Sequence, residues 1–117
     1  MYSERLLDHF QNPRNVGELP PPAITVEASN PACGDIMRLS VRFDAGVVTE
    51  VRYKVRGCTA SIAAGSALTE WIAGRTPAEI AAFAPSMVDD AVGGLAAESK
   101  HAAALCLDAI KLLLKRM

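Results

Sequence analysis

Three short stretches of this chain carry side chains that bind metal ions. They are the turn around Cys33 and Asp35, the glycine–cysteine pair at Cys58, and the lysine–histidine pair at His101. Thiolates, carboxylates and imidazoles are the ligands that zinc and iron take from proteins. Taken singly, these residues have plainer interpretations, as a turn cysteine, a small buried side chain and a surface histidine. Because all of them lie at the ends of expected strands or helices, where functional side chains are usually presented, we interpret them together as one candidate metal site.

The neighbouring residues favour exposed, ionised ligands. Asparagine, proline and glycine around Cys33 favour a tight, irregular turn. Residues two apart in extended backbone point the same way, so Cys33 and Asp35 are expected to be presented together. Cys58 lies at the expected start of a helix, where free amides and the helix dipole favour its thiolate. The charge of Lys100 is expected to favour a nearby thiolate in the same way.

The third cysteine, Cys106, belongs to the inward stripe of the last expected helix. This stripe comprises Ala102, Leu105, Cys106, Ala109, Ile110 and Leu113. A core thiol is the favoured interpretation, because free cysteines are among the most buried residues. The alternative is that Cys106 is a metal ligand. It lies one turn beyond Ala102 on the same face, about 6 Å along the axis, and metal–sulfur bonds of about 2.3 Å tolerate little displacement.

Composition limits the classes of protein. The chain has 117 residues, 50% of them hydrophobic and 5% aromatic, so we expect a single domain over residues 1–117 with an aliphatic core. A net charge of −1 argues against a nucleic-acid binder, and no apolar run reaches the length of a membrane span. Three cysteines give no closed disulfide framework, and no secretory segment is recognisable, so we expect a reducing compartment, the cytoplasm.

Hydrophobic spacing predicts one short helix followed by three strands. Residues 2–10 have helical spacing, with Ser3 as the cap. Alternating polar and apolar residues over 24–28, 37–43 and 47–56 predict antiparallel strands with one face on a core.

A three-residue hairpin loop is expected at Asp44-Ala45-Gly46. This loop fixes a register in which Phe43 faces Val47, Leu39 faces Val51 and Arg38 faces Arg52. The alternation places Val48 on the solvent side of its strand. Basic residues on that side form a stripe, interpreted as an ordinary solvated sheet face, with a docking surface for an acidic partner as the alternative. The stripe comprises Arg38, Arg42, Arg52, Lys54 and Arg56.

Helices are expected after the strands. One runs over 59–73, capped by Thr59. A capping box with Thr76 and Glu79 starts a second, a turn follows at 86–92, and a long helix covers 97–115. Strands first and helices after predict an α+β fold: a three-stranded antiparallel meander with helices packed on one face and a long C-terminal helix.

These residues resemble the IscU/NifU N-terminal family of iron–sulfur cluster assembly scaffolds over nearly the whole chain. The resemblance begins at Tyr2-Ser3-Glu4. The further segments that carry it are Asp8-His9-Phe10-Gln11-Asn12-Pro13-Arg14-Asn15-Val16-Gly17, Asn30-Pro31-Ala32-Cys33-Gly34-Asp35, Gly57-Cys58-Thr59-Ala60-Ser61, His101-Ala102 and Leu107-Asp108-Ala109-Ile110-Lys111.

The resemblance implies a function and a ligand set. It implies a scaffold, not an enzyme, that accepts sulfur from a cysteine desulfurase, assembles a transient [2Fe–2S] cluster and passes it to a recipient or carrier protein. By position, Cys33 and Cys58 would be thiolate ligands, Asp35 a ligand that keeps the site labile, and His101 a nearby or alternate ligand. Zinc or iron could occupy the same site, and we expect a monomer or a weak homodimer.

Two positions depart from the family pattern. Ala102 stands where the family has its third cysteine, a ligand and sulfur acceptor. Leu95-Ala96-Ala97-Glu98-Ser99 lacks the prolines and lysine of the segment that an Hsp70-type chaperone recognises in the IscU branch, so chaperone-assisted transfer is not expected.

Three functions therefore stay open. The first is a working scaffold that uses Cys33, Asp35, Cys58 and His101, or recruits Cys106. The second is a divergent zinc- or iron-binding paralogue that contacts a desulfurase or carrier without building clusters. The third, the weakest, is a sulfur-transfer protein with Cys58 as nucleophile.

Overall fold

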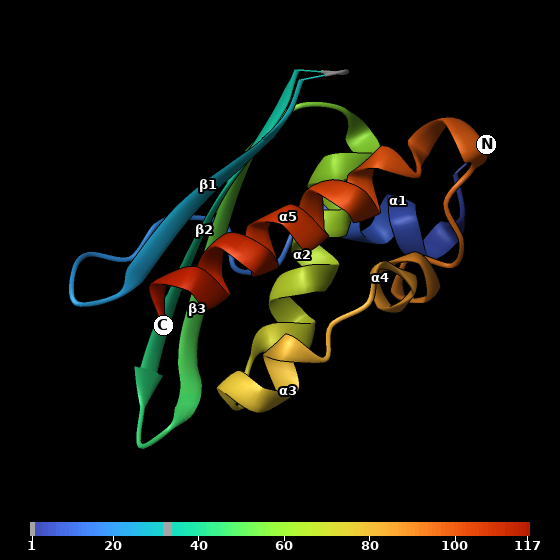
Figure 1. Cartoon of the computed structure of the whole chain (residues 1–117). Coiled ribbons are helices and arrows are strands. Elements are labelled where there is room, and N and C mark those ends of the chain that lie inside the picture. The colour runs from blue at the N-terminus through green and yellow to red at the C-terminus, as the bar shows by residue number, and fades with distance from the viewer. Residues whose placement is uncertain (1, 32–33) are drawn as a thin grey trace.

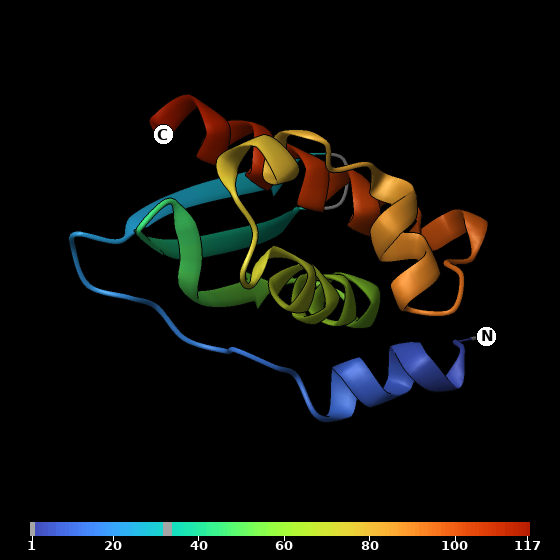
Figure 2. The same cartoon turned by 90° about the horizontal axis from the view of Figure 1, so that it is seen from below.

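The computed structural model describes residues 2–31 and 34–117. Its described elements are α1 (Glu4–Gln11), β1 (Ile24–Asn30), β2 (Asp35–Asp44), β3 (Val47–Arg56), α2 (Thr59–Ile72), α3 (Pro77–Ala81), α4 (Pro85–Ala91), a 3-10 turn (Ala97–Ser99) and α5 (His101–Arg116). The described strands form one antiparallel sheet in the order β1-β2-β3. The helices lie on one side of this sheet (Figures 1 and 2). The predicted α+β fold is therefore confirmed.

The core lies between the sheet and the two long helices. Met37, Leu39 and Val41 of β2 are fully buried, and α2 and α5 pack against the sheet. All six residues of the predicted inward stripe of α5 are buried. Close approach of α2 requires Gly65, because a Cβ there would lie 2.5 Å from the ring of Tyr53. No helix in the described ranges is long and apolar enough to cross a membrane.

Two predicted helix starts are confirmed, and two need correction. Ser3 accepts a hydrogen bond from the Leu6 amide, and Thr76 and Glu79 form the predicted capping box. The last helix was expected from residue 97, but residues Ala97–Ser99 form a 3-10 turn and α5 begins at His101. Thr59 was the wrong choice of cap, because the extended backbone at position 58 makes Cys58 the N-cap of α2. The candidate ligand therefore lies at the helix boundary itself.

The predicted hairpin register is wrong. Asp44 pairs with Val47, which leaves a two-residue loop at Ala45-Gly46, and both of its residues have positive φ angles, 54° and 82°. Such a loop matches the right-handed twist of the flanking strands. A bulge at Arg42/Phe43 then shifts the remaining pairs. The observed partners are Val41 with Val51, Leu39 with Tyr53 and Arg38 with Lys54.

The bulge changes which side of β3 is buried at its start. Val48 is 3% exposed, contrary to the solvent side predicted for it. Its amide donates to the Arg75 carbonyl at 3.0 Å, and its carbonyl accepts from the Gly74 amide at 3.0 Å. The bulge reverses the alternation of side chains between Val48 and Val51, so both are buried, and the segment after α2 pairs with the backbone of Val48.

Several basic residues of the outer sheet face are paired with carboxylates. Arg38 contacts Glu18 at 2.9 Å and Glu27 at 3.2 Å, and Arg42 contacts Glu50 at 3.2 Å. The hydrogen bond from Arg38 holds the pKa of Glu18 below its usual value. Exposed pairs of this kind contribute little to stability and are typical of a solvated sheet face.

Candidate metal centre

Three of the predicted ligands converge at one end of the sheet. Asp35 is the first residue of β2, Cys58 caps α2, and His101 is the first residue of α5. The Cys58 sulfur lies 3.3 Å from Asp35 Oδ2 and 3.4 Å from His101 Nε2, and these last two atoms lie 3.6 Å apart. Residues separated by more than sixty positions along the chain thus present three donor atoms to one point.

The spacing of these donors fits a tetrahedral ion. Bonds of about 2.3 Å to sulfur and about 2.0 Å to nitrogen or oxygen, at tetrahedral angles, separate ligand atoms by about 3.3–3.6 Å. The observed separations of 3.3, 3.4 and 3.6 Å lie in this range. The three side chains therefore fit zinc or iron without a change of backbone.

Asp35 is held in place by a network of donors. Its side chain is 7% exposed, and Oδ2 accepts a 2.5 Å hydrogen bond from the Ser61 hydroxyl. Burial raises the pKa of this carboxyl, but the hydrogen bonds from Ser61 and Cys58, with the nearby His101, outweigh it and keep the pKa below its usual value. The carboxylate is therefore kept ionised, which is the form that binds a metal.

Gly57 is needed for the approach of α2 to this carboxylate. A Cβ at position 57 would lie 2.5 Å from Asp35 Cγ and under 3 Å from both carboxylate oxygens. A larger residue would therefore push Asp35 away from the Cys58 sulfur.

His101 is oriented through its other ring nitrogen. Nδ1 lies 3.1 Å from the Glu98 carbonyl oxygen. Since a carbonyl only accepts, we assign the proton to Nδ1, which leaves the Nε2 lone pair directed toward Cys58 and Asp35. Lys100 does not lie in this cluster of donors, because its ammonium contacts Asp89 at 2.9 Å.

The remaining cysteines differ from this group. Cys33 lies outside the described residues. Cys106 is 0% exposed in the core, and burial raises the pKa of its thiol to about 12. Among the described residues it is not part of the group of three. The geometry favours the core-thiol interpretation of Cys106.

The sequence pattern gave neither Ser61 nor Gly57 a role in the candidate site. Both lie within the motif around Cys58, and Ser61 follows Cys58 by three residues, which brings their side chains together in the first turn of α2, with the sulfur 3.4 Å from the hydroxyl. That spacing was the available signal. Their contact with Asp35 depends on the meeting of β2 and α2, which the pattern of either element alone does not show.

Fold and site together define a small α+β domain in which three side chains that could hold a metal ion, Asp35, Cys58 and His101, lie within 4.8 Å of one another. Residues 1–116 match the family model of the NifU-like N terminal domain. The chain belongs to this family of IscU/NifU-like scaffolds.

Curated relatives cover most of the chain. It is 37% identical over 114 residues to an iron–sulfur cluster assembly scaffold protein IscU of Azotobacter vinelandii, covering 94% of this chain and 88% of that one. It is 35% identical over 111 residues to IscU 1 of Archaeoglobus fulgidus, covering 95% and 72%. It is 42% identical over 111 residues to a bifunctional NifU/MnmA protein of Rubrobacter xylanophilus, covering 93% of this chain and 23% of that longer protein.

Solved structures support the fold. A scaffold candidate for the SUF system of Fervidobacterium islandicum AW-1 has a TM-score of 0.76 at 20% identity and covers 97% of this chain and 96% of that one. The N-terminal part of a NifU-like protein from Brucella abortus has a TM-score of 0.64 at 22% identity, covering 97% and 80%.

Proposed function

We propose that this protein is an iron–sulfur cluster assembly scaffold. It receives iron and sulfur, holds a labile [2Fe–2S] cluster as cargo and passes it to recipient proteins. The observation that carries this proposal is the convergence of the Asp35, Cys58 and His101 donor atoms within 4.8 Å of one another. Membership of a family whose curated relatives are named as such scaffolds supports it.

The proposed ligand set has four donors. A [2Fe–2S] cluster takes two protein ligands on each iron. Asp35, Cys58 and His101 supply three of them, and Cys33, two residues before Asp35 in the sequence, supplies the fourth. A carboxylate is a hard donor and holds soft iron–sulfide less firmly than a thiolate does. This ligand set therefore favours release of the cluster.

Partners and location follow from the same proposal. A cysteine desulfurase is the proposed source of sulfur, and carrier or recipient iron–sulfur proteins are the proposed acceptors. We propose a cytoplasmic protein that is a monomer or weak homodimer.

A second function is favoured by Ala102 and by the tetrahedral spacing of the donors. With no thiol at position 102, the three described donors suit a single zinc or iron ion. The protein would then be a metal-binding paralogue that contacts a desulfurase or carrier without building clusters.

Anaerobic reconstitution separates these functions. The protein is incubated with ferrous iron, cysteine, a cysteine desulfurase and a dithiol, which supplies the electrons that convert persulfide sulfur to sulfide. Visible absorption and acid-labile sulfide are then measured. A scaffold gains iron and sulfide in equal amounts, whereas the paralogue gains metal without sulfide. Cys58→Ala is expected to abolish metal binding. The matched control Cys106→Ala is expected to retain it.

A third variant tests the position, Ala102, at which this chain lacks the third cysteine of the family. Ala102→Cys is expected to raise the cluster yield, because it restores a thiol next to His101. An unchanged yield would show that the native site already uses a complete ligand set.

A further inference from the structure

β1 is an edge strand whose outer side has no strand partner in the described structure. The sheet order places β1 beside β2 only. The opposite edge, β3, is partly covered, because Tyr53 exchanges backbone hydrogen bonds of 2.9 Å with Asn15 and Gly17. The two edges of the sheet are therefore not equivalent, and β1 is the open one (Figure 1).

Three residues of β1 direct their backbone groups away from the sheet. The carbonyl of Thr25 accepts a hydrogen bond from the Arg116 guanidinium at 3.3 Å, so it points outward. Backbone direction alternates along a strand, so Glu27 and Ser29 also present their amides and carbonyls outward. Both residues are exposed. Unpaired edge groups of this kind are a template for another strand.

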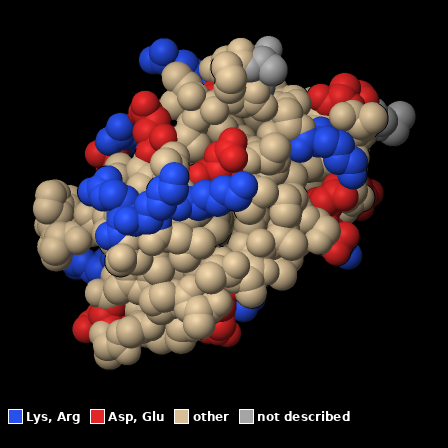
Figure 3. All heavy atoms as spheres, viewed as in Figure 1, with Lys and Arg blue, Asp and Glu red and all other residues tan. Residues whose placement is uncertain are grey.

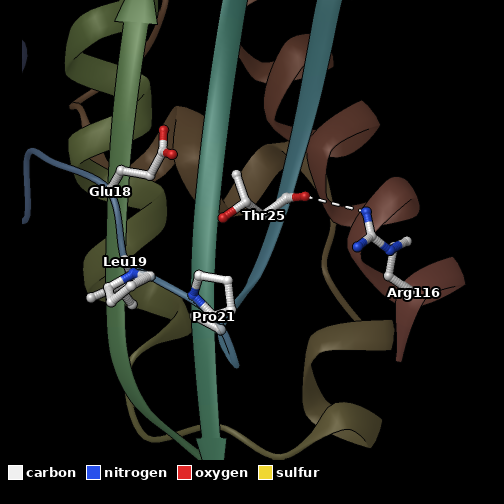
Figure 4. Close-up of a pocket in the computed structure, with 7 residues that line it drawn as sticks. Glu18, Leu19, Pro21, Thr25 and Arg116 are labelled. Atoms are coloured by element: carbon white, nitrogen blue, oxygen red, sulfur yellow. Dashed lines mark hydrogen bonds between the residues drawn. The ribbon is translucent and has the colours of Figure 1, made fainter.

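Two hollows flank this edge. One, of about 500 Å³, lies between residues 18–23 and the start of β1, and Figure 4 shows Arg116 beside Thr25 at its border. The other, of about 340 Å³, lies between β1 and the last turns of α5, and its lining includes Leu112 and Lys115. Residues 18–23, which line the first hollow, contact the outer sheet face through Glu18 and Arg38, whereas α5, which lines the second, packs on the inner face. There is therefore space on each side of the strand for the side chains of an added strand.

The charge beside this edge is positive. Lys111, Lys115 and Arg116 are exposed on α5, and none of them has a carboxylate within 4 Å in the ranges described. Figure 3 shows Lys and Arg side chains gathered over the C-terminal part of α5. The acidic residues near the edge, Glu18 and Glu27, are already paired with Arg38.

We propose that the β1 edge binds an extended acidic segment of a partner protein by strand addition. The segment's backbone pairs with Thr25, Glu27 and Ser29. Acidic side chains at alternate positions contact Lys115 and Arg116. A carboxylate that takes Arg116 also releases the Thr25 carbonyl for pairing, so charge recognition and strand pairing assist each other.

A second copy of this chain does not fit the edge as well. Symmetric antiparallel pairing of β1 with β1 would bring together the Lys and Arg residues of two α5 helices, which have no carboxylate partner in the part of the chain described. Like charges in such positions destabilise an interface. An acidic partner instead neutralises them.

The probe is acetyl-Glu-Thr-Glu-Thr-Glu-Thr amide, with the Lys-Thr peptide of the same length as control. Titration into the full chain is followed by amide chemical shifts and amide hydrogen exchange. The acidic peptide is expected to shift the Thr25, Glu27 and Ser29 amides and slow their exchange, and the basic peptide to do neither. No shift at millimolar acidic peptide, or equal binding of both peptides, would overturn the proposal.

Two pairs of variants separate backbone pairing from charge. Glu27→Pro removes the outward amide, a change that edge strands tolerate, and is expected to weaken binding at least tenfold relative to Glu27→Ala, which loses the same charge and keeps the amide. Lys115→Glu with Arg116→Glu is expected to weaken binding roughly tenfold. Lys54→Glu, on β3, is expected to change it less than about twofold.

Results that contradict strand addition at β1 can be told apart from a loss of metal binding at the candidate site. Equal binding by Glu27→Pro and Glu27→Ala would exclude strand addition. A wild-type dimer that Glu27→Pro abolishes, measured by sedimentation, would assign the edge to a second copy and overturn the acidic partner. Should Glu27→Pro fail to fold, two other measurements test the proposal: peptide binding by the Lys115→Glu, Arg116→Glu variant, and hydrogen exchange of the Thr25, Glu27 and Ser29 amides. All four variants are expected to bind zinc as the wild type does.

Discussion

Ser61→Ala tests whether the metal centre is preorganised by its neighbours. Ser61 is 0% exposed, and its hydroxyl donates to Asp35 Oδ2 at 2.5 Å and lies 3.4 Å from the Cys58 sulfur. A hydrogen bond to a charged group contributes about 1.5–3 kcal/mol. Removing the hydroxyl is expected to raise the pKa of Asp35 and to free the carboxylate to rotate. Loss of such supporting contacts typically weakens metal binding about 10–100-fold.

Zinc affinity is the measurement, by competition with a chromophoric chelator at pH 7 and at pH 5. The affinity of Ser61→Ala is expected to fall at both values and to fall further at pH 5, because its Asp35 is more readily protonated. Ser66→Ala is the matched control, because it makes the same change in the same helix. The buried Ser66 hydroxyl lies 2.7 Å from His9 Nδ1, away from the candidate metal site.

Two results would refute the reasoning. Zinc binding by Ser61→Ala equal to that of the wild type would show that Asp35 is not a ligand or needs no support. An equal loss in Ser66→Ala would show that general destabilisation of α2, not the hydrogen bond, weakens the site.

Three other predictions concern His9, Gly57 and the two described cysteines. Burial lowers the pKa of His9 in the folded state, so protonation of His9 disfavours folding. The free energy of unfolding is therefore expected to fall as the pH drops below the unfolded-state pKa of about 6.5. Urea titrations between pH 8 and 5 measure this dependence, and His9→Gln is expected to flatten it. Gly57→Ala is expected to displace Asp35 and weaken zinc binding at least tenfold, with helical circular dichroism unchanged. Iodoacetamide is expected to alkylate Cys58 while sparing the buried Cys106 until urea unfolds the protein, as peptide mass mapping would show.

The secondary structure was predictable because its signals are local. The caps Ser3 and Thr76 directly precede the helices that they start. The polar–apolar alternation lies within each strand itself. The hairpin register was not predictable in the same way. It depends on the contacts of Val48 with Gly74 and Arg75, which are distant in sequence and form only when α2 has folded back on the sheet.

The candidate site was predictable by residue type and element position, but its geometry was not. Asp35 and Cys58 lie beside expected element boundaries, and His101 lies near the start of the helix expected over 97–115; the structure places all three at element boundaries. Their separations of 3.3–3.6 Å depend on how closely α2 approaches β2, which is controlled by the absence of a side chain at Gly57. A pattern of periodicity contains no signal for that distance.

The exposed fractions of the three donor side chains suit a site that holds a metal cargo transiently better than one that holds a permanent ion. The Asp35 side chain is 7% exposed and fixed by Ser61, whereas the His101 side chain is 28% exposed and Cys58 is half-buried. One side of the site is thus rigid and the other faces solvent. A closed structural metal site buries all of its ligands, whereas an open one leaves a position for exchange. A rigid carboxylate beside an accessible thiol and imidazole therefore suits entry and release of iron and sulfide better than a permanent structural ion.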